Sequence, residues 1–269
     1  MQEMVSRYKE DIAFLENDAV YREAMQLNVD GKQEDALNRL ANALQESDDA
    51  AVQDAYITAM VIVAYSSPAQ NAMANMNSTP ISDIFLNLSE NLIPELSGNA
   101  RYRLMYEQAN CLANQGDHSR SDEVLVALQN ELISVPSSEW YFNAKYTLAL
   151  HAVAKNDLQT AARYLEPLYA TQDYYSDSMK DQLAFQLVNV YGPMHAWDRL
   201  ISVAERLRPK LANDAESLVS VLQHLATAYF QTGQYSLAAE TFEELSQLAN
   251  TNALSQMSLA ICDDAKNMG

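Results

Sequence analysis

Six side chains in this sequence have the chemistry to bind a metal ion or to attack a substrate. They are four histidines and two cysteines: His118, His151, His195, His224, Cys111 and Cys262. They form no HExxH, CxxC or His-rich cluster, so the ligand spacing of a zinc site is missing. The glycine-rich loops that hold nucleotide phosphates and the GxSxG turn that presents a nucleophilic serine are missing as well. We therefore predict no enzyme activity, no catalytic residue, no metal site, no cofactor and no small-molecule substrate.

Acidic residues outnumber basic ones by 36 to 17, which gives a formal net charge of −19. Adjacent carboxylates such as Asp48-Asp49 and Glu243-Glu244 are typical of solvated helix faces. A field of this sign repels nucleic-acid phosphates and anionic lipids, so we expect neither as a partner. Two interpretations stay open: the charge prevents self-association, or it attracts a partner that exposes Lys and Arg.

The N-terminal segment MQEMVSRYKEDIAFLEND carries charges throughout and lacks the apolar centre of a signal peptide. The most apolar stretch, Ala55 to Tyr65, is too short to span a bilayer. We expect no membrane insertion and a cytoplasmic location. If the chain is a processed or excised fragment, a periplasmic location is the alternative.

The composition favours helices. The sequence has only 6 glycines and 7 prolines, and it is rich in Ala, Leu, Gln, Glu and Met, which favour helix. Its hydrophobic content of 48% is enough for a packed core. Two cysteines are too few for a disulfide framework.

The clearest pattern lies between Leu222 and Asn250, where two short amphipathic stretches meet at Gly233. Their apolar positions are Leu225, Ala226 and Tyr229 before the glycine and Tyr235, Ala238 and Phe242 after it. The two alanines let the helix backbones approach closely, while the larger residues fill the space around them. Neither helix buries its stripe alone, so the hairpin needs neighbours like itself.

Weaker copies of this hairpin run back towards the N-terminus. Their turn positions fall at Gly31, Gly116, Asn156, His195 and Gly233. The last four are 38 to 40 residues apart, and each is flanked by apolar residues at helical spacing. This series resembles the tetratricopeptide repeat (TPR), whose minimal unit has 34 residues. Ser121 and Leu200 occupy places where the TPR pattern prefers alanine. The resemblance implies an all-α, right-handed superhelical solenoid of TPR-like helix hairpins.

We expect one solenoid over residues 1–269, with about five to six repeats. Residues 67–80 are an irregular junction, and the sequence leaves open whether they form a long loop or belong to a repeat with an inserted helix. A capping helix is predicted over 251–266, because Leu254, Met257 and Ile261 share one face and a solenoid must cover its last apolar surface.

An N-terminal helix that carries Ile12, Leu15, Val20 and Ala24 is expected to cap the opposite end of the solenoid.

The resemblance also implies where a ligand binds. In TPR proteins the first helix of each repeat lines a concave groove, and ligand contacts concentrate at its second, fifth and ninth positions. Here the fifth position is aromatic in four of five copies, and asparagine stands at the ninth position in two. Carried over to this sequence, the predicted peptide-binding strip is Arg103, Tyr106, Asn110, Tyr146, Phe185 and Asn189.

Asparagine side chains offer a donor and an acceptor to an extended peptide backbone, and aromatic rings offer apolar area. The alternative is that these rings fill the inner core between repeats. The basic clamp that some relatives use for C-terminal carboxylates needs several Lys, Arg and Asn residues, and only Arg103 and Asn110 fit its positions.

The sequence therefore predicts a non-catalytic interaction scaffold or adaptor that binds a peptide segment or a partner protein in its groove. Two alternatives stay open. The chain could be the sensory or regulatory TPR region of a bacterial signalling protein, which a catalytic domain beyond Gly269 would reveal. It could also be a structural subunit of a larger assembly that contacts its neighbours through the convex face.

Overall fold

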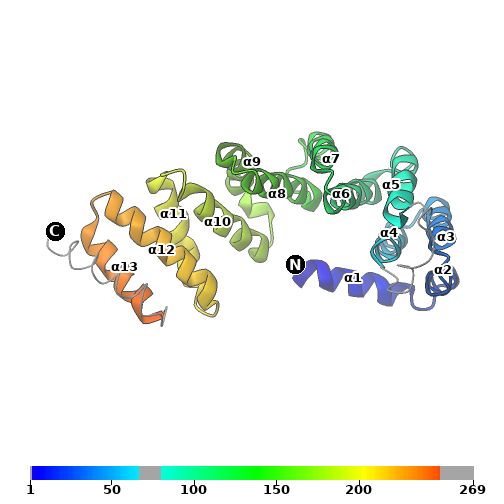
Figure 1. Cartoon of the computed structure of the whole chain (residues 1–269), viewed down its shortest axis with the longest axis horizontal. Helices are drawn as coiled ribbons and strands as arrows, with labels where there is room; N and C mark the ends of the chain where they lie inside the picture. Colours follow the sequence, from blue (N-terminus) through cyan, green and yellow to red (C-terminus); the bar gives the residue numbers. More distant parts are fainter. Residues whose placement is uncertain (1, 67–79, 249–269) are drawn as a thin grey trace. The chain divides into compact units, whose positions relative to one another are not determined.

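The structure is a computed structural model that describes residues 2–66 and 80–248, with side chains from Tyr8 onward. The described residues form α-helices and two short 3-10 turns, with no strand among them (Figure 1). The α-helices are α1 (Gln2–Leu15), α2 (Ala19–Val29), α3 (Gln33–Glu46), α4 (Ala50–Tyr65), α5 (Ile81–Leu92), α6 (Gly98–Asn114), α7 (His118–Glu131), α8 (Glu139–Ala154), α9 (Leu158–Ala170), α10 (Asp177–Tyr191), α11 (Trp197–Leu207), α12 (Ala215–Gln231) and α13 (Tyr235–Leu248).

The chain divides into two compact units, Met1–Ile133 and Ser134–Gly269, called unit 1 and unit 2 below. The described helices of unit 1 are α1 to α7, and those of unit 2 are α8 to α13. In both units consecutive helices pack as hairpins, namely α2–α3, α6–α7, α8–α9, α10–α11 and α12–α13.

All five turns that the sequence predicts are built in the same way. The predicted turn residues have left-handed backbones, with φ of 77° at Gly31, 85° at Gly116, 58° at Asn156, 57° at His195 and 77° at Gly233. In the last hairpin, Gln234 N–H donates to the carbonyl of Tyr229 at 2.8 Å, and Gly233 N–H donates to that of Phe230 at 3.1 Å. This is the Schellman arrangement, and equivalent bonds close the other four turns. The predicted turn positions are confirmed.

In two hairpins the residue after the turn also starts the next helix. The carboxylate of Asp117 accepts a hydrogen bond from Arg120 N–H at 3.1 Å, and that of Asp157 accepts one from Thr160 N–H at 3.0 Å. These are helix N-caps. The bonds from Thr160 hold the pKa of Asp157 below its usual value, so the cap is present at neutral pH. A Gly-Asp or Asn-Asp pair thus ends one helix and begins the next.

Small residues lie where the paired helices approach most closely. Ala226 of α12 and Ala238 of α13 are both fully buried, as the sequence predicts. In α7 the corresponding small residue is Ser121, which is also fully buried and whose hydroxyl has no hydrogen-bond partner among the described residues. Ser121 therefore contributes its small volume rather than a polar contact.

Between the hairpins α2–α3 and α6–α7 lie α4 and α5. Helix α4 is apolar on nearly every side, and it packs against α3, α5 and α6. Helix α5 begins after Pro80 and buries Phe85 and Leu92 on one face. Most of the predicted junction at 67–80 and the predicted capping helix at 251–266 lie outside the described residues. The single array over residues 1–269 also stays a prediction.

The left-handed turns allow a matched test within unit 2. Gly233→Ala should destabilise the protein by about 1–2 kcal/mol, because a Cβ is strained at a φ of 77° even though no atom lies within 4 Å of its place. Asn156→Gly should change stability by less than about 0.5 kcal/mol, because the turn already tolerates the left-handed conformation. Chemical unfolding followed by circular dichroism measures both. Equal effects of the two substitutions would show that the left-handed conformation of the turn does not determine the stability of the hairpin.

Candidate peptide-binding faces

The six candidate residues lie on the first helices of hairpins, as predicted, but they belong to two units. Helix α6 of unit 1 carries Arg103, Tyr106 and Asn110. In unit 2, α8 carries Tyr146, while α10 carries Phe185 and Asn189. The two groups are described separately below.

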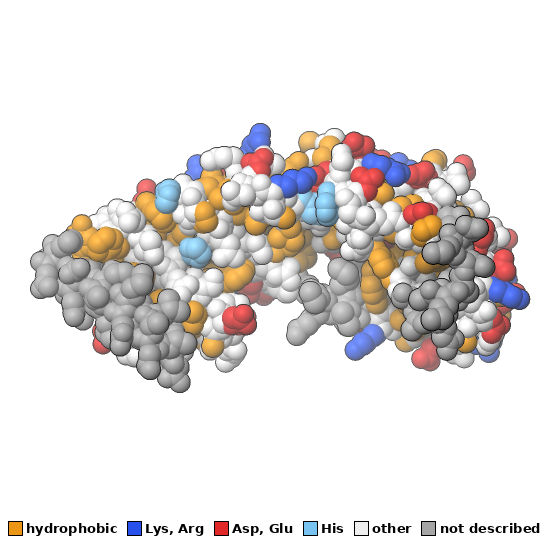
Figure 2. Space-filling view, viewed as in Figure 1, with side chains coloured by type: hydrophobic (Ala, Val, Ile, Leu, Met, Phe, Trp, Pro, Cys, Tyr) orange, Lys and Arg blue, Asp and Glu red, His pale blue; other side chains and the backbone are white. Residues whose placement is uncertain are grey.

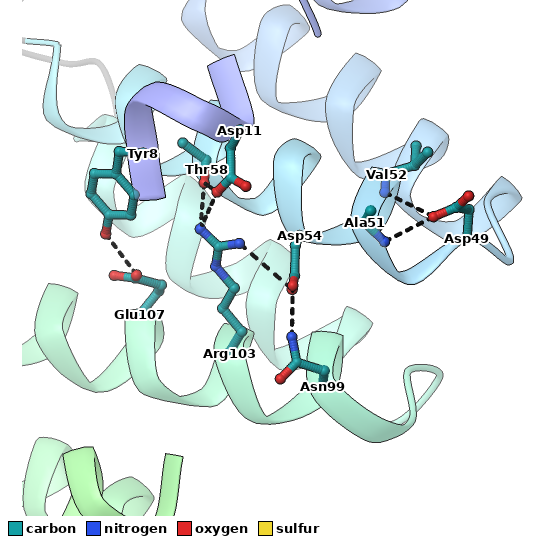
Figure 3. A network of polar contacts seen from close by, with 10 residues as sticks. All are labelled: Tyr8, Asp11, Asp49, Ala51, Val52, Asp54, Thr58, Asn99, Arg103 and Glu107. Carbon is teal, nitrogen blue, oxygen red and sulfur yellow. Dashed lines mark hydrogen bonds and ion pairs between the residues drawn. The ribbon is translucent and has the colours of Figure 1, made fainter. Parts of the chain in front are cut away.

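Arg103 is buried inside unit 1, with 1% of its surface exposed. Its Nη2 donates to the carboxylate of Asp11 at 2.8 Å and to the hydroxyl of Thr58. Its Nη1 lies 3.6 Å from the carboxylate of Asp54 (Figure 3). Helix α1 supplies Asp11, and α4 supplies the other two partners. The guanidinium is therefore occupied by groups of the chain itself, and a peptide cannot contact it while α1 stays in place.

The cause of this burial is the position of α1. The helix packs mainly against α4, and Figure 1 shows it on the side of α6 that faces away from α7. The prediction of one N-terminal capping helix is therefore wrong: Ile12 and Leu15 lie in α1, which packs on α4, whereas Val20 and Ala24 lie in α2. The TPR pattern has no place for an additional helix across the first helices, so the repeat alone gives no sign of it. The sequence does contain one sign of this packing. Tyr8 and Asp11 are one turn apart, so they place a hydroxyl and a carboxylate on the same side of the N-terminal helix.

A second polar contact joins α1 to α6. The hydroxyl of Tyr8 donates to Glu107 at 2.7 Å (Figure 3). Burial, and then the negative charge of Glu107, raise the pKa of Tyr8 far above its usual value, so the hydroxyl stays protonated and remains a donor. Tyr106 is close enough to Tyr8 to raise that pKa further. The side chain of Asn110 donates to Glu107 at 3.4 Å. The three candidates of unit 1 thus surround the contact with α1.

In unit 2 one candidate, Tyr146, belongs to an aromatic cluster. The ring of Tyr146 stacks on Phe142 with 5.5 Å between ring centroids, and Phe142 meets Tyr175 edge to face at 4.8 Å. Burial raises the pKa of Tyr146, and a hydrogen bond with the side chain of Gln186 on α10 opposes that shift.

Among the side chains of α8 and α10 that are at least partly exposed, four stand at the fifth and ninth positions of these first helices. They define what we call the α8–α10 face: Tyr146, Leu150, Phe185 and Asn189. Each helix contributes two of them, one turn apart, so the two members share a helix face. Leu150 is exposed, and the other three are half-buried. Asn189 makes no side-chain hydrogen bond with the described residues, so its amide is available to a ligand.

Charge is distributed unevenly over the visible surface. In Figure 2, Lys, Arg, Asp and Glu side chains gather over unit 1, whereas the visible side chains of unit 2 are mostly uncharged. Several of the unit 1 charges pair between helices, as Arg120 does with Glu90 at 2.7 Å.

Five of the six His and Cys residues lie in the described part of the chain, and Cys262 lies outside it. Within residues 2–66 and 80–248, no group of three or more His, Cys, Asp and Glu is placed to hold a metal ion. Cys111 is buried beside the backbone of Ser82, and burial raises the pKa of its thiol to about 11. His224 is half-buried, which lowers its pKa. A Cβ at Gly192 would lie 2.5 Å from Nδ1 of His224, so these two residues pack α10 against α12. His224 therefore has a packing role.

In the part of the chain that the structure describes, no helix combines the length and the apolar character needed to cross a membrane.

The fold is TPR-like: it consists of helix hairpins that turn at a left-handed residue and pack through small residues. No protein-family model matches the chain, and no curated protein matches it either. Among solved structures, the chain is similar to a kinesin-light-chain-type protein of Podosopora anserina with nearly identical TPR-like repeats, and to a point variant of it. The identity is 14%, the TM-score is 0.49, and the match covers 86% of this chain and 92–93% of those chains.

A circular tandem repeat protein with a novel repeat topology is also similar, at 14% identity and a TM-score of 0.21, over 93% of this chain and 62% of that one. Similarity at this identity concerns the fold alone.

The buried ion pair in unit 1 leads to a stability prediction. Arg103→Gln should destabilise unit 1 by about 3 kcal/mol, because it leaves two largely buried carboxylates without their cation. The matched control Arg120→Gln removes an exposed pair and should cost at most about 1 kcal/mol. Both tryptophans, Trp140 and Trp197, lie in unit 2, so their fluorescence reports on that unit.

We expect Arg103→Gln to cause an early loss of helicity by circular dichroism, before tryptophan fluorescence changes. Equal unfolding curves for the two variants would contradict a structural role for Arg103.

The burial of Cys111 also has a measurable consequence. A thiol with a pKa of about 11 holds roughly two orders of magnitude less thiolate at pH 8.5 than an exposed cysteine does. The Cys111 peptide should therefore be alkylated by iodoacetamide far more slowly in the folded chain than in denaturant. Mass spectrometry of the digested protein separates this peptide from that of Cys262. Equal rates in both states would show that Cys111 is an accessible, reactive thiol.

Proposed function

We propose that this protein is a non-catalytic interaction scaffold that binds an extended peptide segment of a partner protein on the α8–α10 face of unit 2. The observation that carries the proposal is that Tyr146, Phe185 and Asn189 stay partly exposed on the first helices of neighbouring hairpins. These are the positions at which the TPR resemblance implies ligand contacts. Arg103, Tyr106 and Asn110 are not part of this face, because they surround α1 in unit 1.

The chemistry of the α8–α10 face suits a peptide rather than a small charged ligand. The amide of Asn189 offers a donor and an acceptor, which matches the alternating groups of a peptide backbone. The rings of Tyr146 and Phe185 and the side chain of Leu150 offer apolar area for the side chains of the peptide. Such a face can bind the peptide backbone and one or two apolar side chains of the peptide.

The aromatic cluster also restricts the face before binding. Tyr146 is held by its stacking on Phe142 and by its hydrogen bond with Gln186. A side chain that is already ordered loses less conformational entropy when a ligand binds. The net charge of −19 favours the approach of a partner segment that carries Lys or Arg outside the apolar contact.

The proposal is tested by affinity capture with the double variant Phe185→Ala, Asn189→Ala. The partner retained by the wild-type chain should bind the variant at least about tenfold more weakly, because the variant loses an aromatic contact and an amide. The matched control is Ser202→Ala, Arg206→Ala, which changes two exposed side chains, also one turn apart, on the second helix of the same hairpin.

Circular dichroism and tryptophan fluorescence decide whether the loss concerns binding. If the double variant unfolds at lower denaturant while the control does not, the two residues belong to the core and the proposed face is wrong. If both variants keep the partner, binding takes place elsewhere on the chain. Loss of the partner in both variants would indicate contact through the second helices instead.

A further inference from the structure

Helix α1 is an additional element on unit 1, outside the hairpins. It contacts α4 and α6, which are separated from it by up to about a hundred residues of chain, as the pair Tyr8–Glu107 shows. Its polar contacts come from Tyr8 and Asp11, which face the same side because they are one turn apart. Of its described side chains, only Leu15 is buried, and Phe14 is 56% exposed. Among the residues from Tyr8 onward, release of α1 would expose Leu15 and the half-buried Tyr8 and Ile12, and it would break the contacts of Tyr8 and Asp11.

The surface beneath α1 requires a cover. Helix α4 buries a continuous run from Ala55 to Val61, so it has no polar side that could face water along this run. Helix α6 adds the buried side chains of Arg103 and Glu107 beside it. A face that combines an apolar helix with a buried cation and a carboxylate is complementary to an amphipathic helix with a hydroxyl and a carboxylate of its own.

The contact with Arg103 is incomplete. Only Nη2 makes hydrogen bonds, and it shares them between Asp11 and Thr58. The Nε and Nη1 atoms are buried and have no hydrogen-bond partner among the described residues. A guanidinium can donate five hydrogen bonds and binds a carboxylate best through two parallel ones. Asp11 supplies one such bond, so the site has donors that a better-placed carboxylate could use.

We propose that the face formed by α4 and α6 is a helix-docking site and that α1 occupies it as an internal ligand. The partner that fits is an amphipathic helix of another protein that presents an aromatic hydroxyl to Glu107 and, one turn later, a carboxylate to Arg103. Such a helix replaces α1 in the same position. This site is separate from the α8–α10 face and does not depend on the function proposed for that face.

The test uses the full chain and a fluorescently labelled synthetic peptide with the sequence of residues 2–17, followed by fluorescence anisotropy. In the wild-type chain α1 competes for the site, so the peptide binds weakly. The variant Asp11→Asn loses its contact with Arg103 and should bind the peptide at least about tenfold more tightly, because a larger fraction of the site is open. A peptide with asparagine at the position of Asp11 should not show this tighter binding to the Asp11→Asn chain.

The matched control chain is Glu16→Gln, which removes a carboxylate at the exposed end of the same helix. It should bind the peptide as the wild-type chain does. The inference is overturned if Asp11→Asn binds the peptide no better than Glu16→Gln, or if the two peptides bind equally. Light scattering shows whether the Asp11→Asn chain forms a dimer without peptide. Such a dimer would mean that α1 of a second copy, and not a helix of another protein, occupies the site, and it would overturn the assignment.

Hydrogen exchange on the wild-type chain gives an independent measurement that does not require a variant to fold. The amides of α1 should exchange at least about tenfold faster than the protected amides of α4 and α6, because α1 opens without unfolding them. If the amides of all three helices exchange together, α1 is an integral part of unit 1 and the inference fails. The variant Phe185→Ala, Asn189→Ala should leave peptide binding unchanged, which separates this site from the α8–α10 face.

Discussion

The structure depends on the close pairing of two short amphipathic helices around a left-handed turn. Neither helix can bury its apolar side without the other, and the turn must reverse the chain within a few residues. A Schellman turn does this because one residue with positive φ satisfies the last carbonyl groups of the first helix. Small residues such as Ala226 and Ala238 then let the helices meet closely. The same solution recurs in five hairpins, which gives the protein a TPR-like fold.

Unit 1 departs from this regular plan through one buried cation. Arg103 stands on a first helix at a position that a repeat could leave open to a ligand, yet α1 and α4 enclose it with oxygen atoms. Burial of a guanidinium is unfavourable unless nearby carboxylates compensate its charge. Asp11 and Asp54 provide this compensation. Tyr8, which stays protonated, contacts Glu107 beside them, so both polar contacts of α1 lie close to Arg103 (Figure 3).

The same structural position has different neighbours in the two units. The fifth position of the first helix is Tyr106 in α6 and Tyr146 in α8. In unit 1 this ring lies beside Tyr8 of α1. In unit 2 it stacks on Phe142 at the edge of a cluster and stays partly exposed. The repeat fixes the helix position that carries the ring, whereas the packing around it differs between the units, and both rings are half-buried.

The sequence by itself determined the elements that depend on neighbouring residues. Apolar spacing and the turn residues at Gly31, Gly116, Asn156, His195 and Gly233 were sufficient to predict the all-α hairpins, because helix periodicity and left-handed turns are local properties. The tertiary structure alone decided the place of α1 and the burial of Arg103. Asp11 and Arg103 are 92 residues apart, and no local pattern records such a contact. Charge pairing across that distance becomes visible only when the helices are packed.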